Sequence, residues 1–147
     1  MLPWRHIVLA TDFSSCSEQA TDAAIELAEK FEAALTVVHA LEYPTYVYTA
    51  EAFTPVDLLA PLEQGAEKAL AQALERVRKK IPRAQSILRR GSPALEVVAV
   101  AKEVKADLLV IGTHGRRGPT HFLLGSVAER VVQHAQIPVL TIRPASK

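Results

Sequence analysis

Five short runs of apolar residues, separated by stretches with helical periodicity, constrain the fold of this 147-residue chain more than any other feature. The runs are continuous rather than alternating and are rich in β-branched residues, which is typical of strands buried on both faces of a parallel sheet. They are His6–Ala10, Leu35–Ala40, Gln85–Leu88, Asp107–Ile111 and Ile137–Ile142.

Between these runs, apolar residues recur at i, i+3, i+4 and i+7, which predicts four helices. The order βαβαβαβαβ predicts an α/β fold, a single-domain doubly wound five-stranded parallel sheet over residues 1–147 with right-handed crossovers. Residues 42–61 form a longer connection with room for a short helix, and the second helix is expected from Ala66. Start and stop residues mark the predicted helix boundaries. A Ser15–Glu18 capping box starts the first helix, and Pro82 stops the second. Ser92 and Pro93 start the third helix, and Gly125 and Ser126 open the fourth.

The composition argues against several classes of protein. A formal net charge of +1 provides no global basic field for nucleic acid. One cysteine, Cys16, permits no disulfide within the chain and suits a reducing compartment. No run approaches the ~18 apolar residues of a membrane span, and the first residues do not resemble a secretory signal. We therefore expect a cytoplasmic protein with no nucleic-acid and no membrane partner.

Four of the six glycines lie between residues 112 and 125, directly after the fourth run and before the fourth helix. Glycine lacks a Cβ atom, so its backbone can approach a ligand closely. A helix N-terminus offers unpaired N–H groups and a positive dipole end, and Arg116, Arg117 and Ser126 add charge and a hydroxyl donor. These parts suit a phosphate site, although neither the Walker spacing nor the dinucleotide fingerprint is present. Composition alone also allows a surface loop with a glycine turn.

The spacing Gly112-x2-Gly115-x9-Gly125-Ser126 is similar to the ATP-binding signature of universal stress proteins. The segments IVLATDFS, VVHA, DLLVIGTHG, LLGSVAERVV and IPVLTIRP also resemble that family, so the resemblance covers the chain except for residues 42–61. It implies a Rossmann-like adenine-nucleotide-binding architecture with strand order 3-2-1-4-5.

The resemblance also implies roles for individual residues. Asp12 would hold Mg²⁺ through water, since carboxylate oxygens suit that ion. The alternative role of Asp12 is to cap a turn or helix. Members of the family often have proline where Ala10 stands and a larger aliphatic residue where Ala40 stands. The implied contacts are Ala10, Thr11 and Asp12 with base and ribose, Ala40 with the adenine edge, Gly112, Thr113, His114, Gly115, Arg116, Arg117 and Gly118 around ribose and phosphates, and Gly125, Ser126 and Val127 with phosphate oxygens.

Other polar residues have structural interpretations. No histidine pair has the i, i+4 spacing of a metal site, and there is no Cys/His cluster, so no structural metal is expected. Arg89 and Arg90 could add phosphate charge or could lie at a solvated strand end, and these alternatives stay open. Structural roles are expected for Asp107 as a turn residue, for Cys16 as a small helix residue, and for His6, His39 and His134.

The resemblance implies an ATP-binding stress-response regulator that acts as a homodimeric, nucleotide-dependent binding module. The apolar strand Ile137–Ile142 near the end of the chain is expected at a sheet edge, where it would pair with a second copy. No catalytic residue is predicted, and a dedicated enzyme is not expected. Two alternatives are a slow Mg-dependent ATPase or phosphotransferase using Asp12 with Arg116 or Arg117, and a nucleotide-free dimeric chaperone or scaffold.

Overall fold

The computed structural model describes residues 4–43, 56–114 and 124–144. In these residues five parallel strands form one sheet in the order β3-β2-β1-β4-β5. Their bounds are β1 (His6–Ala10), β2 (Ala34–Leu41), β3 (Gln85–Arg90), β4 (Leu108–Gly112) and β5 (Val139–Ile142). The predicted α/β class and the strand order 3-2-1-4-5 are therefore confirmed.

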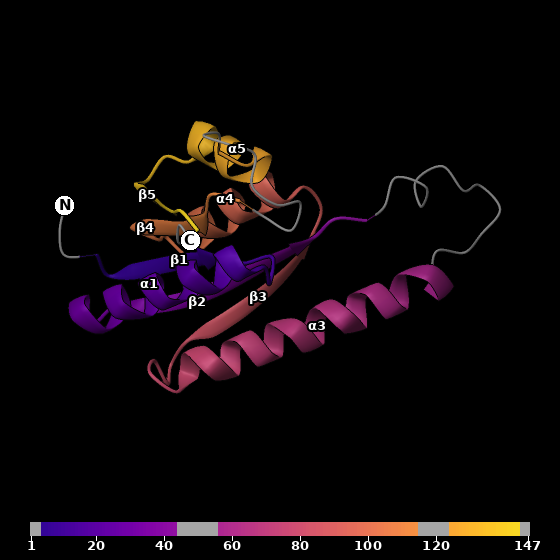
Figure 1. Cartoon of the computed structure of the whole chain (residues 1–147), viewed down its shortest axis with the longest axis horizontal. Helices are drawn as coiled ribbons and strands as arrows, with labels where there is room; N and C mark the ends of the chain where they lie inside the picture. Colours follow the sequence, from indigo (N-terminus) through magenta and orange to yellow (C-terminus); the bar gives the residue numbers. More distant parts are fainter. Residues whose placement is uncertain (1–3, 44–55, 115–123, 145–147) are drawn as a thin grey trace.

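Helices cover both faces of the sheet (Figure 1). Helices α1 (Ser15–Phe31) and α3 (Val56–Arg78) pack on one face, and α4 (Pro93–Glu103) and α5 (Ser126–His134) pack on the other. Because β1 and β4 lie between two such layers, successive side chains of each strand enter different cores. The first core contains Ile7, Leu9, Val37, Leu108 and Val110, and the second contains Val8, Val38, Leu109, Ile111 and Val131. This double burial explains why the apolar runs are continuous.

The start of α1 differs from the prediction by one residue. Ser14 is the N-cap, with extended backbone angles (φ −75°, ψ 168°), and its Oγ accepts from the Ser17 N–H at 3.2 Å. The predicted Ser15–Glu18 capping box is wrong, because Ser14 is the N-cap and Ser15 is already the first residue of the helix. The Ser14 N–H is held by Asp12 Oδ1 at 3.0 Å. That contact keeps Ser14 outside the helix.

Helix α3 begins about ten residues earlier than predicted, at Val56 rather than at Ala66. The helix therefore includes the last part of the segment 42–61, and Pro61 lies inside it. Pro61 has no N–H to donate, which removes one helical hydrogen bond but does not end the helix. Further along, Gly65 is exposed and a Cβ atom there would meet nothing within 4 Å. These two residues interrupt the apolar periodicity without interrupting the helix.

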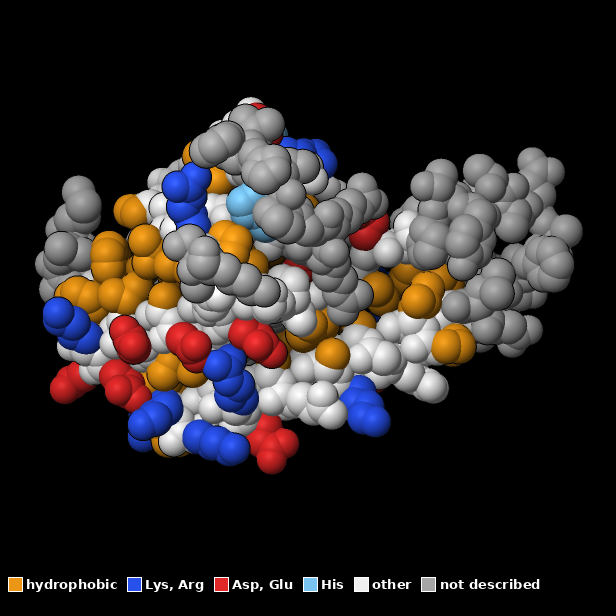
Figure 2. Space-filling view, viewed as in Figure 1, with side chains coloured by type: hydrophobic (Ala, Val, Ile, Leu, Met, Phe, Trp, Pro, Cys, Tyr) orange, Lys and Arg blue, Asp and Glu red, His pale blue; other side chains and the backbone are white. Residues whose placement is uncertain are grey.

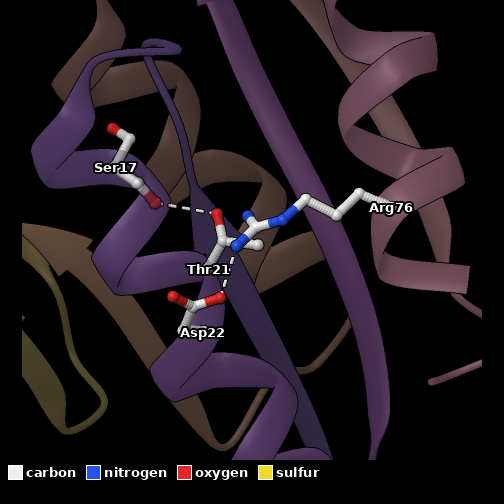
Figure 3. A network of polar contacts seen from close by, with 4 residues as sticks. All are labelled: Ser17, Thr21, Asp22 and Arg76. Atoms are coloured by element: carbon white, nitrogen blue, oxygen red, sulfur yellow. Dashed lines mark hydrogen bonds and ion pairs between the residues drawn. The ribbon is translucent and has the colours of Figure 1, made fainter. Parts of the chain in front are cut away.

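Polar contacts join α3 to α1 on the face shown in Figure 2, where side chains of both charges mix over these two helices. In the close view of Figure 3, Arg76 of α3 reaches Asp22 of α1 in an ion pair. The Thr21 hydroxyl beside it is buried and donates to the Ser17 carbonyl at 2.7 Å, so it costs little to bury. Both charged side chains are largely exposed, so the ion pair contributes little stability.

Asp107 connects the amino ends of β1 and β4. Its Oδ2 accepts from the N–H groups of Arg5 at 2.8 Å and His6 at 2.9 Å, which confirms the predicted structural role. His6 Nε2 lies 2.8 Å from Thr36 Oγ1 on β2. Burial lowers the pKa of His6 below its usual value of 6.5, and the nearby Asp107 carboxylate opposes that shift.

Candidate functional site

The carboxyl ends of β1 and β4 are neighbours at the point where the strand order reverses. From β1 the chain crosses to β2 on one side, whereas β4 and β5 lie on the other side. In open parallel sheets a crevice forms at such a point, and ligands bind there. Two of the segments singled out in the sequence, the turn after β1 and the glycine segment after β4, meet at this place.

The turn after β1 is held by hydrogen bonds on both sides of Asp12. The Thr11 N–H donates to the Val38 carbonyl at 2.9 Å, and Ala10 is buried. Asp12 Oδ1 accepts from the Ser14 N–H at 3.0 Å and from the Ser17 hydroxyl at 2.7 Å. The turn-capping role of Asp12 is therefore present, and it fixes the orientation of the carboxylate beside the N-terminus of α1.

Ser17 was not indicated by the sequence as a site residue. It is buried, and its Oγ both donates to Asp12 Oδ1 and accepts from the Asp12 N–H at 3.1 Å. The segment DFSSCSE contains three serines within four positions, so the composition signals a cap without showing which serine holds the aspartate.

His39, near the end of β2, supports the same turn from the side. Its Nδ1 lies 2.8 Å from the Thr11 carbonyl oxygen, and because a carbonyl only accepts, Nδ1 carries the proton in this contact. The Phe13 ring lies 4.4 Å from the His39 ring, and Phe13 has a left-handed φ of 66°. The next residue, Ala40, is buried. His39 thus has the structural role that was expected, and it also shapes the turn.

The glycine segment leaves the sheet and returns to it at one point. The Thr113 N–H donates to the Ile142 carbonyl of β5 at 2.9 Å, and the Gly125 N–H donates to the Thr113 carbonyl at 2.5 Å. Thr113 is buried, and its Oγ1 lies 3.0 Å from His114 Nδ1. We call the Thr113–Gly125 contact the neck. The predicted site residues Gly115, Arg116, Arg117 and Gly118 lie outside the described residues.

Packing explains why glycine stands at positions 112 and 125. A Cβ atom on Gly112 would lie 2.8 Å from the Cys16 sulfur, and one on Gly125 would lie 2.8 Å from the Thr113 carbonyl oxygen. Gly125 has an ordinary φ of −59°, so conformational freedom is not what it supplies. At these two positions the missing side chain makes room for the chain itself. The predicted contacts of Gly112 and Gly125 with a nucleotide stay a prediction.

The N-terminus of α5 is open, in contrast to that of α1. Its N-cap is Gly125, which has no side chain with which to cap the helix, whereas Ser14 caps α1. The N–H groups of Ser126 and Val127 have no acceptor within the described part of the chain, and both residues are exposed. Together with the helix dipole, this arrangement can accept an anion.

Arg89 and Arg90 do not belong to this crevice. They lie on β3, at the far edge of the sheet, where Arg89 pairs with Glu103 and Arg90 pairs with Glu63 at 3.0 Å. The Tyr43 hydroxyl donates to the same Glu63 carboxylate. Of the two alternatives for these arginines, the structure favours the strand end, with both charges paired to carboxylates.

In the described ranges, no three His, Cys, Asp or Glu side chains gather in a group that could hold a metal ion. Nor does any helix in those ranges have both the length and the hydrophobicity of a membrane span.

These features define the class of the protein: a doubly wound α/β domain with an open helix N-terminus and a fixed carboxylate at its switch point. The model of the universal stress protein family matches residues 3–143. The chain therefore belongs to the universal stress protein family.

Relatives of known family that match nearly the whole chain support this assignment. A universal stress protein of Methanocaldococcus jannaschii is 35% identical, with 98% of this chain and 85% of the relative covered. One of Thermus aquaticus is 37% identical, with 95% and 99% covered.

Solved structures are similar as well. The universal stress protein UspA of Lactobacillus plantarum has a TM-score of 0.81 at 25% identity, with 97% of this chain and all of that chain covered. A universal stress protein in complex with cAMP has a TM-score of 0.71 at 26% identity, covering 98% and 100%. One of Archaeoglobus fulgidus in complex with dAMP has a TM-score of 0.66 at 28% identity, covering 97% and 99%.

Proposed function

We propose that this protein is a cytoplasmic, ATP-binding stress-response regulator whose single domain, residues 1–147, works as a homodimeric, nucleotide-dependent binding module. The observation that carries the proposal is the neck, which holds the open N-terminus of α5 at the carboxyl end of β4. β4 is the neighbour of β1, and the turn with Asp12 follows β1. Relatives of similar fold whose structures contain cAMP or dAMP support an adenine nucleotide as the ligand.

The chemistry of the site suits a nucleotide. Phosphate oxygens would take the uncommitted N–H groups of Ser126 and Val127 together with the Ser126 hydroxyl. Ribose and base would lie toward Thr11 and the buried Ala40. His114 would contact the phosphates from the other side of the neck, and the predicted contacts of Gly115, Arg116, Arg117 and Gly118 complete the proposal.

Asp12 is the residue that would hold Mg²⁺. Its Oδ1 accepts hydrogen bonds from Ser14 and Ser17. We therefore propose a contact with the ion through water rather than direct coordination by both carboxylate oxygens. The ion would neutralise phosphate charge. With Asp12→Asn we expect ATP affinity that no longer responds to Mg²⁺, measured by calorimetry with and without the ion.

The first test of nucleotide binding is to denature freshly purified protein and identify any released nucleotide by mass spectrometry, then to titrate ATP by calorimetry. Ser126→Ala removes only the hydroxyl, and we expect roughly tenfold weaker binding, as for one hydrogen bond to a charged group. Ser126→Pro also removes the N–H at a first helical position where proline is tolerated, and should weaken binding further.

Ser92→Ala is the matched control, because Ser92 is the N-cap of α4 and makes no side-chain cap bond. It should leave ATP affinity unchanged. Affinity that is the same in wild type, Ser126→Ala and Ser126→Pro would contradict the site. Protein that carries no nucleotide and gives no heat with millimolar ATP would favour the nucleotide-free scaffold.

The homodimer would form through β5. This strand is at one edge of the sheet, and Val132 of the adjacent α5 is 45% exposed. The carbonyls of Pro138 and Ile142 bond toward β4, so the backbone groups of Val139 and Thr141 point outward, because neighbouring residues of a strand alternate. Thr141→Pro removes one outward N–H and leaves the bonds to β4 intact. Light scattering should show a wild-type dimer and a Thr141→Pro monomer.

A further inference from the structure

A hollow lies between α4 and α5 at the amino edge of the sheet, at the end away from the neck. It has a volume of about 330 Å³, within the range of small-molecule sites. Leu109, near the start of β4, lies in its lining with Ile137, which precedes β5. The glycine segment begins at the opposite end of β4, so the hollow is separate from the proposed nucleotide site. The two helices that flank it lie side by side in Figure 1.

The lining is apolar, and every charged or titratable group in it is a base. Val98, Ala101, Ala106, Leu109 and Ile137 provide an apolar surface, of which Leu109 is fully buried. The basic groups are Lys102, Lys105 and His134, and no carboxylate contributes to the lining.

Among the described residues, neither lysine has an ion-pair partner. The ion pairs of the described residues are Arg76–Asp22, Arg89–Glu103 and Arg90–Glu63, so Lys102 and Lys105 have none there. His134 Nδ1 lies 2.9 Å from the Arg130 carbonyl and must carry a proton in that contact. Its Nε2 can donate to a carboxylate only when the ring is protonated on both nitrogens.

Basic groups near helix C-termini also offset the helix dipole, which is their ordinary role. Here the last carbonyls already have backbone donors, because Lys105 N–H bonds to the Lys102 carbonyl at 3.1 Å and Ala106 N–H bonds to the Ala101 carbonyl at 2.9 Å. At α5 the Ala135 N–H bonds to the Val131 carbonyl at 2.8 Å. The two lysines are therefore not required as caps at these carbonyls, whereas His134 does contact a carbonyl of its own last turn. The dipole does not account for an apolar hollow between the three residues.

We propose that this hollow binds a small carboxylate with an apolar body, the body against the partly exposed Val98 and Ile137 and the carboxylate between Lys102, Lys105 and His134. Apolar burial supplies most of the affinity, and the three basic groups select an anion over a neutral molecule of the same shape.

The test uses octanoate below its micelle concentration, added to the full-length protein and followed by calorimetry and by NMR of the methyl groups. We expect saturable binding, with shifts of the Val98, Leu109 and Ile137 methyl signals. Lys102→Gln/Lys105→Gln should bind about fivefold more weakly, as expected for two exposed charge pairs. Octanol, which lacks the charge, and acetate, which lacks the apolar body, should both bind more weakly than octanoate.

Lys79→Gln/Lys80→Gln is the matched control, because it removes the same charge from exposed residues just after α3. It should leave octanoate affinity unchanged. Val98→Trp fills the hollow and should abolish binding while the charge remains. Equal weakening in the two lysine variants, methyl shifts confined to other regions, or no saturable binding would overturn the proposal.

Discussion

Gly112→Ala tests whether this glycine is required by packing rather than by a ligand. The added Cβ would lie 2.8 Å from the Cys16 sulfur and 3.3 Å from both the carbonyl carbon and oxygen of Cys16. Real Cβ atoms essentially never approach within 3.0 Å, so either α1 or β4 must shift. Cys16 cannot easily turn away, because it is buried and its sulfur lies 3.4 Å from the Ile142 carbonyl oxygen.

We expect Gly112→Ala to lower the free energy of unfolding by about 1–3 kcal/mol, the usual cost of overpacking a filled core. Cys16→Ala removes the sulfur and should remove most of that cost in the double variant, leaving the tight contacts with the Cys16 backbone. The coupling free energy between the two changes should be about 1 kcal/mol or more, measured by urea unfolding of the four proteins without nucleotide.

Gly65→Ala is the matched control for the glycine substitution. Gly65 is exposed inside α3 and a Cβ atom there meets nothing, so this change should stabilise the protein by about 0.5–1 kcal/mol. The packing explanation fails if Gly112→Ala unfolds at the wild-type urea concentration. It also fails if Cys16→Ala leaves the cost of Gly112→Ala unchanged.

Three further predictions concern the amino edge and the helices. The pKa of His6 is lowered on folding, so the unfolded state binds more protons; stability should be full above pH 6.5 and fall as the pH drops below it. His6→Gln should reduce that fall between about pH 6.5 and 5 in urea unfolding. Asp107→Ala leaves the N–H groups of Arg5 and His6 without their acceptor, so it should cost about 1–3 kcal/mol, checked by urea unfolding. Arg76→Gln breaks only the exposed ion pair with Asp22, so thermal unfolding should show a loss below about 1 kcal/mol.

The type and order of the strands and helices follow from the local sequence pattern. Continuous apolar runs signal strands buried on both faces, and β1 and β4 have that environment. The end of the second predicted helix was placed at Pro82, whereas α3 ends at Arg78. Its start was placed much further from the observed position. Pro61 and Gly65 interrupt the pattern but lie on the exposed side of α3, so the helix continues through them.

The candidate site was predictable only in part. The positions of Asp12, Gly112 and Ser126 after strands or before a helix follow from element order, because parallel strands bring their carboxyl ends to one edge. The alternative roles of Asp12, Arg89 and Arg90 could not be decided in this way. Each depends on which carboxylate or hydroxyl is nearest in space.

The sequence by itself determined the class of fold, the family and the edge of the sheet that carries the candidate site. These properties depend on periodicity and on spacing along the chain. The tertiary structure decided which residues distant in sequence contact one another. Cys16 meets the Ile142 carbonyl across 126 positions, and Asp107 holds the Arg5 N–H across 102. Glycine at 112 depends on the helix that packs behind it, and the position of the open N-terminus of α5 depends on the neck. Local preference carries no information about such partners, since they meet only when the sheet is assembled.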